Sequence, residues 1–596
     1  MNARMARRAA RATLAVYLLI GAAHTAGAQR GNSAAPANDV VMRAMRDELA
    51  RSVQQLRLDT LAKPYFIEYR VTEGRARGAT GRLGSLVGTS TGSGNRLMQV
   101  EVRVGDYAFD NTNYFGAGFM PQAFVGFGGL PLDDDYQEIR RQLWLSTDRA
   151  YKQALEALSQ KKAALAGRSR GDTIADFSRE VVTNTTDEVP AAALTDYRTL
   201  ETLARDLSAT FRQSPEIYNS TVGVSESWSR ELYVNSEGTS FTRSRTHATV
   251  GASASTQALD GTGISMAYGA QALTFAELPG RDSLMKGVRD LAGRLTQQRH
   301  VPLADAYDGP VLFEGAAAAE LFNTVVAVKL IGTHRPVTGA MFASLSANAP
   351  GNDWEDLIGS PVLPRWISVV DDPTIAAIDG HIAEHYRVDD QGVTTHPTTL
   401  VDHGVLKTLL TDRAPIAGVE HSTGNHFGFG VRPMNLIVTA DTTVSDADIR
   451  SKLQALAAAQ GHPYAVIVRA LAGTSGPAAG EDPQEFFMAQ AQGRAANGPV
   501  ARAMRVAKLF PDGHEEPMRG AEIFGLTAAS FKEIAAASRT RSVQDVNFSG
   551  GGNILTGGGV GGPVLYQVPS LLFANVTIRK PRGTTPILPV VAPPPR

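Results

Sequence analysis

The stretch VLFEGAAAAELF, residues 311–322, decides the interpretation of this chain. It follows the pair Gly309-Pro310, and such pairs are typical of the start of a new element. Its alanines and its apolar residues at helical spacing predict a buried helix that is entered from a short strand. Glu314 lies near the expected helix start, where the helix dipole favours a carboxylate. The stretch therefore predicts a core helix, and Glu314 either caps it or has another role.

Length and composition place the chain among globular proteins with more than one core. Its 596 residues exceed the size of a single core, and 43% of them are apolar and 20% charged. The net charge of −1 gives no indication of binding to nucleic acid or to an anionic membrane surface. The chain has no cysteine, which excludes disulfides and thiolate metal ligands.

Residues 1–28 are typical of a secretory signal peptide. Arginines precede the apolar run ATLAVYLLIGAA, residues 12–23, which is short for a membrane span. The small residues Ala26-Gly27-Ala28 predict cleavage before Gln29, and the alternative is an uncleaved N-terminal anchor. No other stretch of the sequence approaches the length of a membrane span. We therefore expect an exported protein, periplasmic or secreted.

The remaining residues predict an α+β fold with two domains and a tail. A domain of mixed helices and antiparallel strands is expected over residues 39–300, and a β-rich domain over residues 307–580. Residues 581–596 are rich in Pro and predict an extended, disordered tail. In the first domain, helical periodicity predicts helices at residues 39–58, 136–166, 194–212 and 281–298.

Strand predictions in the first domain depend on alternation and on turn residues. Alternating residues predict four strands, at residues 217–225, 229–236, 239–248 and 250–257. Residues 235–238, NSEG, predict the turn in the middle of this series. Residues 75–95 are rich in Gly, Ser and Thr and predict a loop or a frayed hairpin. The role of the Gly-rich region 74–130 stays open.

Several short motifs follow one another along the chain. They are VNSEG (234–238), ISVVDDP (367–373), VDDQGV (388–393), LVDHGVLK (400–407), STGN (422–425), RPMNL (432–436) and PSLL (569–572). In this order they resemble the TldD/PmbA (TldD/TldE) family of metallopeptidase-related proteins, over about residues 200–578. Single short matches are unspecific, so the ordered spacing carries the resemblance. His403 stands where the family has Asn, and the N-terminal quarter has no counterpart.

The resemblance implies an α+β domain followed by a β-rich domain, usually in a dimer that encloses a cavity. In active members, the two His of an HExxxH motif and a downstream Cys hold a metal. Here Phe313 and Ala318 occupy the two His positions, Glu314 is kept, and there is no Cys. We therefore expect no metal, and zinc only if this interpretation is wrong. By its residues the chain lies nearer the branch without metal ligands, whose members pair with an active TldD-like sister subunit.

The spacing of other candidate residues indicates whether they could form a site. His381 and His385 lie in an expected strand, which would separate them by about 13 Å, too far for one metal ion. Thr423, Gly424 and Asn425 form a loop whose amides could hold a peptide backbone, and the alternative is a tight turn that needs Gly. A serine nucleophile is conceivable at Ser360, Ser422 or Ser475, but none of these three lies in a G-x-S-x-G motif.

Three hypotheses follow from these observations. The first is an exported protein with a degenerate metal site, which acts as a non-catalytic subunit or a scaffold for an extended peptide, in a homodimer or a heterodimer. The second is an active peptidase with an altered site, in which Glu314 acts with His381, His385 or His421. The third is a structural envelope protein.

Overall fold

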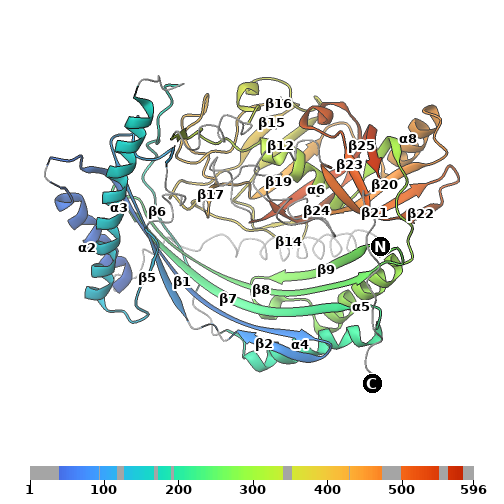
Figure 1. Cartoon of the computed structure of the whole chain (residues 1–596), viewed down its shortest axis with the longest axis horizontal. Coiled ribbons are helices and arrows are strands. Elements are labelled where there is room, and N and C mark those ends of the chain that lie inside the picture. Colours follow the sequence, from blue (N-terminus) through green and yellow to red (C-terminus); the bar gives the residue numbers. More distant parts are fainter. Residues whose placement is uncertain are drawn as a thin grey trace, which may run out of the picture. The chain divides into compact units, whose positions relative to one another are not determined.

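The computed structural model describes residues 39–58, 60–90, 92, 94–116, 126–166, 172–189, 194–339, 352–428, 430–472, 499–548 and 562–580. The predicted signal peptide and the Pro-rich tail lie outside these residues. From Val40 onward the chain forms one compact unit, which contains two large sheets (Figure 1).

The first sheet is built from residues 64–272 and has eight strands, in the order β5-β3-β1-β7-β8-β6, with β2 paired to β1 and β9 to β8. All pairs are antiparallel except β6–β8. The strands are β1 (Pro64–Arg82), β2 (Ser85–Ser90), β3 (Asn95–Val104), β5 (Gly128–Gly129), β6 (Asn184–Asp187), β7 (Asn219–Asn235), β8 (Ser240–Gln257) and β9 (Gly263–Ala272).

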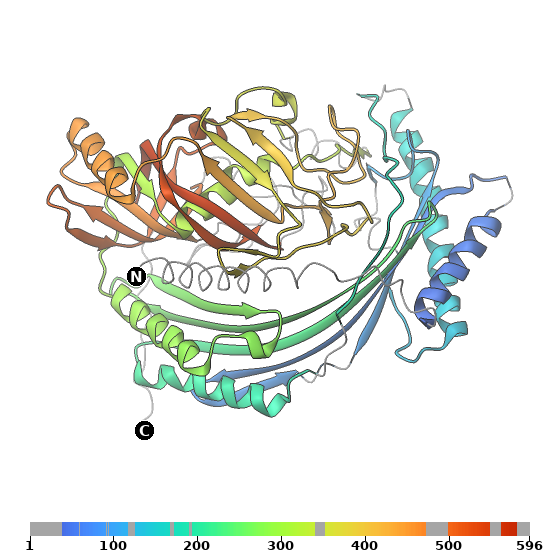
Figure 2. The ribbon, with the colours of Figure 1, turned by 180° about the vertical axis from the view of Figure 1, so that it is seen from behind.

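Four helices cover one face of this sheet (Figures 1 and 2). They are α2 (Val40–Gln55), α3 (Tyr136–Leu165), α4 (Tyr197–Ala209) and α5 (Arg281–Gln298). Helices α2 and α3 pack on the start of β1 at Ile67 and Tyr69, whereas α4 and α5 pack further along it, at Ala79. These three residues share one face because side chains alternate along a strand. The opposite face is left free to contact the C-terminal half.

Residues 75–95 include a hairpin, the second of the two predicted alternatives, and do not form a loop. They contain the end of β1 and all of β2, paired from Arg82–Ser85 to Gly78–Ser90. A Cβ atom on Gly81 would lie 2.4 Å from the carbonyl oxygen of Ala204 in α4. Gly81 therefore allows α4 to approach the sheet closely. The glycine content of residues 75–95 reflects this packing and not a loop.

The prediction of four short strands over residues 217–257 was also wrong, because two long strands replace them. Strands β7 and β8 have 17 and 18 residues and pair along almost their whole length. Buried Val222, Val224 and Trp228 alternate with more exposed residues through the stretch that was expected to interrupt β7. The predicted turn at residues 235–238 is confirmed, with Gly238 at φ 103°.

The second sheet is built from residues 307–579 and has eleven strands. They are β10 (Tyr307–Phe313), β12 (Ile367–Asp371), β15 (Thr398–Asp402), β16 (Val405–Leu406), β19 (Asn435–Ala440), β20 (Ala465–Ala472), β21 (Ala501–Leu509), β22 (Glu515–Met518), β23 (Ala521–Phe524), β24 (Ile534–Phe548) and β25 (Gly562–Arg579). Strand β10 pairs with both β20 and β25, so β10, β20, β21, β23 and β25 close into a ring.

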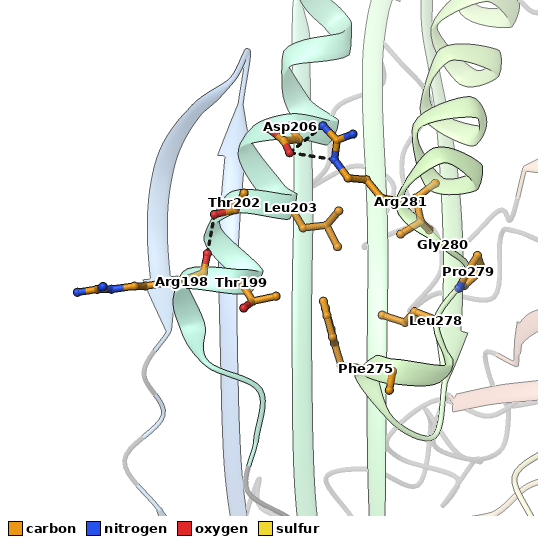
Figure 3. A pocket seen from close by; sticks show the side chains of 12 residues that line it. Arg198, Thr199, Thr202, Leu203, Asp206, Phe275, Leu278, Pro279, Gly280 and Arg281 are labelled. Carbon is orange, nitrogen blue, oxygen red and sulfur yellow. Dashed lines mark hydrogen bonds and ion pairs between the residues drawn. The ribbon is translucent and has the colours of Figure 1, made fainter.

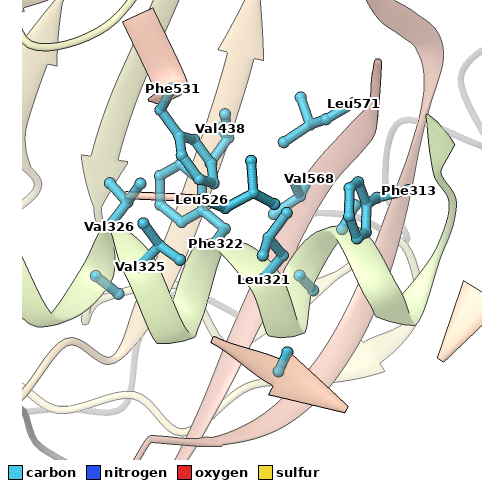
Figure 4. Packing of buried hydrophobic residues seen from close by; sticks show 14 of the residues in the cluster. Phe313, Leu321, Phe322, Val325, Val326, Val438, Leu526, Phe531, Val568 and Leu571 are labelled. Carbon is cyan, nitrogen blue, oxygen red and sulfur yellow. The ribbon is translucent and has the colours of Figure 1, made fainter. Parts of the chain in front are cut away.

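Two helices bury opposite sides of β10. Helix α6 (Ala316–Val325) packs in the largest apolar core, which also holds Val311 and Phe313 (Figure 4). Helix α8 (Asp446–Ala459) packs in a second cluster together with Leu312. The predicted strand followed by a buried helix is therefore confirmed.

Three small sheets complete the described structure. They are β4 (Tyr114–Phe115) with β11 (Val337–Thr338), β13 (Ala377–Ile378) with β14 (His381–Ile382), and β17 (His426–Phe427) with β18 (Gly430–Val431). The fold is α+β, with helices and an antiparallel sheet in the N-terminal half and a β-rich C-terminal half, as the sequence predicts.

Candidate functional site

Glu314 lies in the turn between β10 and α6. Phe313 ends the strand, Gly315 has φ 58°, and the helix begins at Ala316. The Glu314 carboxylate pairs with two guanidinium groups, Arg450 and Arg469, each at 2.9 Å. It is therefore held by ion pairs from α8 and β20 rather than acting only as a helix cap.

Glu515 joins the same group of charges. Its carboxylate lies 3.2 Å from Arg450 and 2.7 Å from Arg469, so two glutamates and two arginines alternate. The hydrogen bond from Arg469 lowers the pKa of Glu515, and the same two glutamates raise the pKa of Arg469. All four side chains stay partly exposed, which limits the stability that these pairs contribute.

The residues at the family's metal positions do not fit a metal ion. Phe313 and Ala318 are completely buried, and Phe313 packs edge-on against Phe573 at 5.7 Å between ring centroids. Neither side chain has a donor atom, and both guanidinium partners of Glu314 compete with any cation for its oxygens. In the part of the chain that the structure describes, no three His, Asp or Glu side chains group to hold a metal elsewhere.

The predicted peptide-binding loop is tied to the interior. The Asn425 amide donates to Asp371 at 2.7 Å, and the Thr423 hydroxyl donates to the carbonyl of Thr411 at 3.0 Å. Gly424 has φ 76°, and a Cβ there would lie 2.8 Å from the Thr394 carbonyl oxygen. The loop is thus a tight turn that needs Gly. Its contact with a peptide stays a prediction.

Asp371, at the end of β12, is the anchor of this loop. Besides Asn425, it accepts hydrogen bonds from the N–H groups of Met434 and Asn435 at 2.8 and 3.0 Å. Burial raises its pKa to about 7, although the three donors act in the opposite direction. The sequence marks Asp371 only as part of a motif, and it does not indicate that three donors from two other segments converge on this carboxylate.

Two further buried carboxylates follow at Asp389 and Asp390. Asp389 accepts hydrogen bonds from the N–H groups of Gln391, Val393 and His426, and burial raises its pKa to about 6. His426 in turn lies 2.9 Å from Asp412. Burial opposes the charged imidazolium, but the Asp412 carboxylate outweighs this effect and raises the pKa of His426.

Asp390, in the C-terminal half, forms ion pairs with residues on the face of the first sheet that the helices leave uncovered. We call the group of Arg70, Glu231, Arg243 and Asp390 the charged junction. Asp390 pairs with Arg243 of β8 and with Arg70 of β1, and both arginines also pair with Glu231 of β7. Burial alone would raise the pKa of Asp390, but the two guanidinium groups hold it well below its usual value. Asp390 belongs to the motif VDDQGV, but no sequence motif points to its pairing with Arg70 and Arg243.

The structure does not bring the candidate histidines to Glu314. His421 is exposed and lies 3.5 Å from Glu180, whereas the His385 carbonyl accepts a hydrogen bond from Arg245. His381 lies in the two-residue strand β14, but His385 lies outside it, so the predicted strand through both histidines was wrong. None of these contacts involves the turn that holds Glu314.

Within the described residues, no helix is long and apolar enough to cross a membrane.

Comparison with known proteins identifies two family domains. The model described as the PmbA/TldA metallopeptidase central domain matches residues 184–297, and the model described as the PmbA/TldA metallopeptidase C-terminal domain matches residues 307–461. No curated protein matches the chain significantly.

Solved structures share the fold at low identity. TldE from Thermococcus kodakarensis is 14% identical with a TM-score of 0.53, and the match covers 90% of this chain and 100% of that one. A Thermotoga maritima protein proposed as a modulator of a DNA gyrase is 14% identical with a TM-score of 0.52, covering 86% and 96%. A Bacteroides thetaiotaomicron protein of the same description is 11% identical with a TM-score of 0.53, covering 91% and 98%. With both domain matches in the order of the predicted motifs, the chain belongs to the TldD/PmbA family.

Proposed function

We propose that the chain is a non-catalytic member of this family, which binds an extended peptide or a sister subunit without cleaving it. The observation that carries the proposal is the pairing of Glu314 with Arg450 and Arg469 beside a buried Phe313 and Ala318. A carboxylate whose oxygens contact two guanidinium groups is a poor general base, because those oxygens are not free to accept a proton from a water molecule.

The chemistry of amide hydrolysis supports the same proposal. Cleavage needs a strong nucleophile and stabilisation of the oxyanion that develops, and a metal supplies both in the family's HExxxH motif. General-base help alone contributes only about a hundred- to ten-thousand-fold. Glu314 without metal ligands beside it would therefore leave the chain far below peptidase rates.

We expect the purified chain to show no cleavage of unfolded peptides, with or without a chelator, and to hold much less than about one metal ion per chain. Peptide assays and elemental analysis of untagged protein measure both. Glu314→Gln serves as the control and should change neither result. Chelator-sensitive cleavage that Glu314→Gln abolishes would favour an active peptidase with an altered site.

The scaffold itself is tested by binding. Fluorescence anisotropy with labelled unfolded peptides measures peptide binding, and sedimentation in native extracts measures assembly as a homodimer or with a sister subunit. A chain that is strictly monomeric and binds no peptide would contradict the scaffold hypothesis. The hypothesis of a structural envelope protein would then remain.

Export is the last part of the proposal and rests on residues 1–28. Protein isolated from the native envelope or secreted fraction should begin at Gln29. N-terminal sequencing tests this, and a start at Met1 or Asn2 would reject cleavage and favour the uncleaved anchor.

A further inference from the structure

A pocket of about 600 Å³ lies between α4 and the start of α5, on the helix-covered face of the first sheet. Figure 3 shows Leu203 of α4 and Phe275 and Leu278, from the segment before α5, pointing toward its centre. All three side chains are partly buried and pack at the edge of an apolar core. A pocket of this size, lined mainly by apolar side chains, is typical of a binding site.

Among the described residues, no charged side chain around this pocket points an unpaired charge into it. Arg281 pairs with Asp206 at 3.0 Å, and Figure 3 shows the Arg198 side chain pointing away. The Thr202 hydroxyl donates to the carbonyl of Arg198 in its own helix. An uncharged, apolar occupant therefore fits the pocket better than an ionic one.

We infer that the pocket is a docking site for the chain's own C-terminal segment, residues 583–595. This segment, GTTPILPVVAPPP, carries no charged residue and supplies Ile587, Leu588, Val590 and Val591. Proline-rich chains favour the polyproline II conformation, and they dock in grooves lined by aromatic side chains at low entropic cost. Phe275 provides such a side chain here.

The length of the segment agrees with this assignment. Ile578, near the end of β25, pairs with Tyr307, which follows the C-terminal end of α5 by nine residues. The pocket lies at the other end of α5, whose 18 residues span about 27 Å. Residues 587–591 stand seven to eleven positions beyond Lys580, which corresponds to about 22–34 Å of chain in the polyproline II conformation.

The absence of cysteine from the chain allows a direct test by disulfide trapping. The full chain with Leu203→Cys and Val590→Cys should crosslink within one molecule under mild oxidation, because docking brings the two Cα atoms within the short range that a disulfide needs. The matched control is Leu259→Cys with Val590→Cys. Leu259 is exposed, and its N–H donates to Arg299 just beyond the C-terminal end of α5.

A tail that moves freely would reach Leu259→Cys at least as fast as Leu203→Cys. Docking predicts a rate at least tenfold higher for the Leu203→Cys pair, measured by intact mass and peptide mapping. Equal rates would overturn the inference, and crosslinked dimers would overturn it by assigning the pocket to the tail of a second copy. If Leu203→Cys lowers the melting temperature, Thr199→Cys at the rim of the pocket replaces it.

A second measurement separates docking from proximity. A chain ending at Lys580 should bind a synthetic peptide of residues 581–596, and Val590→Asp in that peptide should weaken binding at least tenfold. The substitution lies in the peptide, so it cannot unfold the protein. Equal binding by both peptides, or by neither, would contradict a specific apolar site.

Discussion

The Asp390→Asn substitution should lower the free energy of unfolding by about 3–5 kcal/mol, because it removes one partner from a buried group of charges. The change preserves the shape of the side chain. It leaves Arg70 and Arg243 with Glu231 as their shared carboxylate. The side chains of both arginines are at most 10% exposed, so water cannot replace the lost charge.

Urea denaturation measures the total effect, and hydrogen exchange at residues 384–428 shows whether the charged junction opens first. The control is Asp441→Asn, since the Asp441 side chain is 63% exposed and pairs with exposed His403. The control should change stability by less than about 1 kcal/mol. A loss at Asp390 no larger than that of the control would mean that the charged junction contributes little to holding the two halves together.

The helices and strands of this fold were predictable where a single hydrophobic periodicity continued over the whole element. Helix α5 occupies residues 281–298, as its periodicity predicts. The prediction left gaps at residues 226–228 and at Thr249, whereas β7 and β8 continue through both positions. Local composition cannot distinguish a turn from the exposed face of a long strand.

The site was less predictable because its contacts join distant positions. Glu314 could be recognised as an isolated carboxylate, but its partners Arg450 and Arg469 lie 136 and 155 positions away. Asp371 and Asn425, 54 positions apart, belong to separate motifs that meet only in the fold. A sequence shows which groups carry charge, whereas tertiary packing decides which of them are buried together.

Stability should increase as the pH is lowered from about 8 to about 5, in contrast to most acid-sensitive proteins. Burial raises the pKa of Asp371 to about 7 and of Asp389 to about 6, whereas carboxylates in the unfolded chain titrate near 4. Between these values the folded state binds more protons than the unfolded state, so stability falls as pH rises. The raised pKa of His426 acts in the same direction above about pH 6.5.

The rise in stability on lowering the pH does not continue to very low pH. The depressed pKa of Asp390 contributes stability that is present above about pH 4 and is lost at lower pH, because the unfolded chain takes up that proton while the folded state still keeps the carboxylate ionised. The optimum should therefore lie near pH 5. One pKa unit corresponds to about 1.4 kcal/mol, so Asp371 alone accounts for on the order of 4 kcal/mol between pH 4 and 7.

The Asp371→Asn substitution tests the cause of this pH dependence. Asn425 Oδ1 is buried and has no hydrogen-bond partner among the described residues, although the amide nitrogen of the same side chain donates to Asp371. If the Asn425 amide rotates, a protonated Asp371 can donate to this oxygen, and the amide that Asp371→Asn introduces can donate to it in the same way. The variant should thus fold, and its stability should depend much less on pH than that of the wild type. Urea denaturation at pH 5.5 to 8.5 and constant ionic strength measures both slopes, with Asp441→Asn as the control. A wild-type stability that rises with pH over this range would contradict the protonated carboxylates.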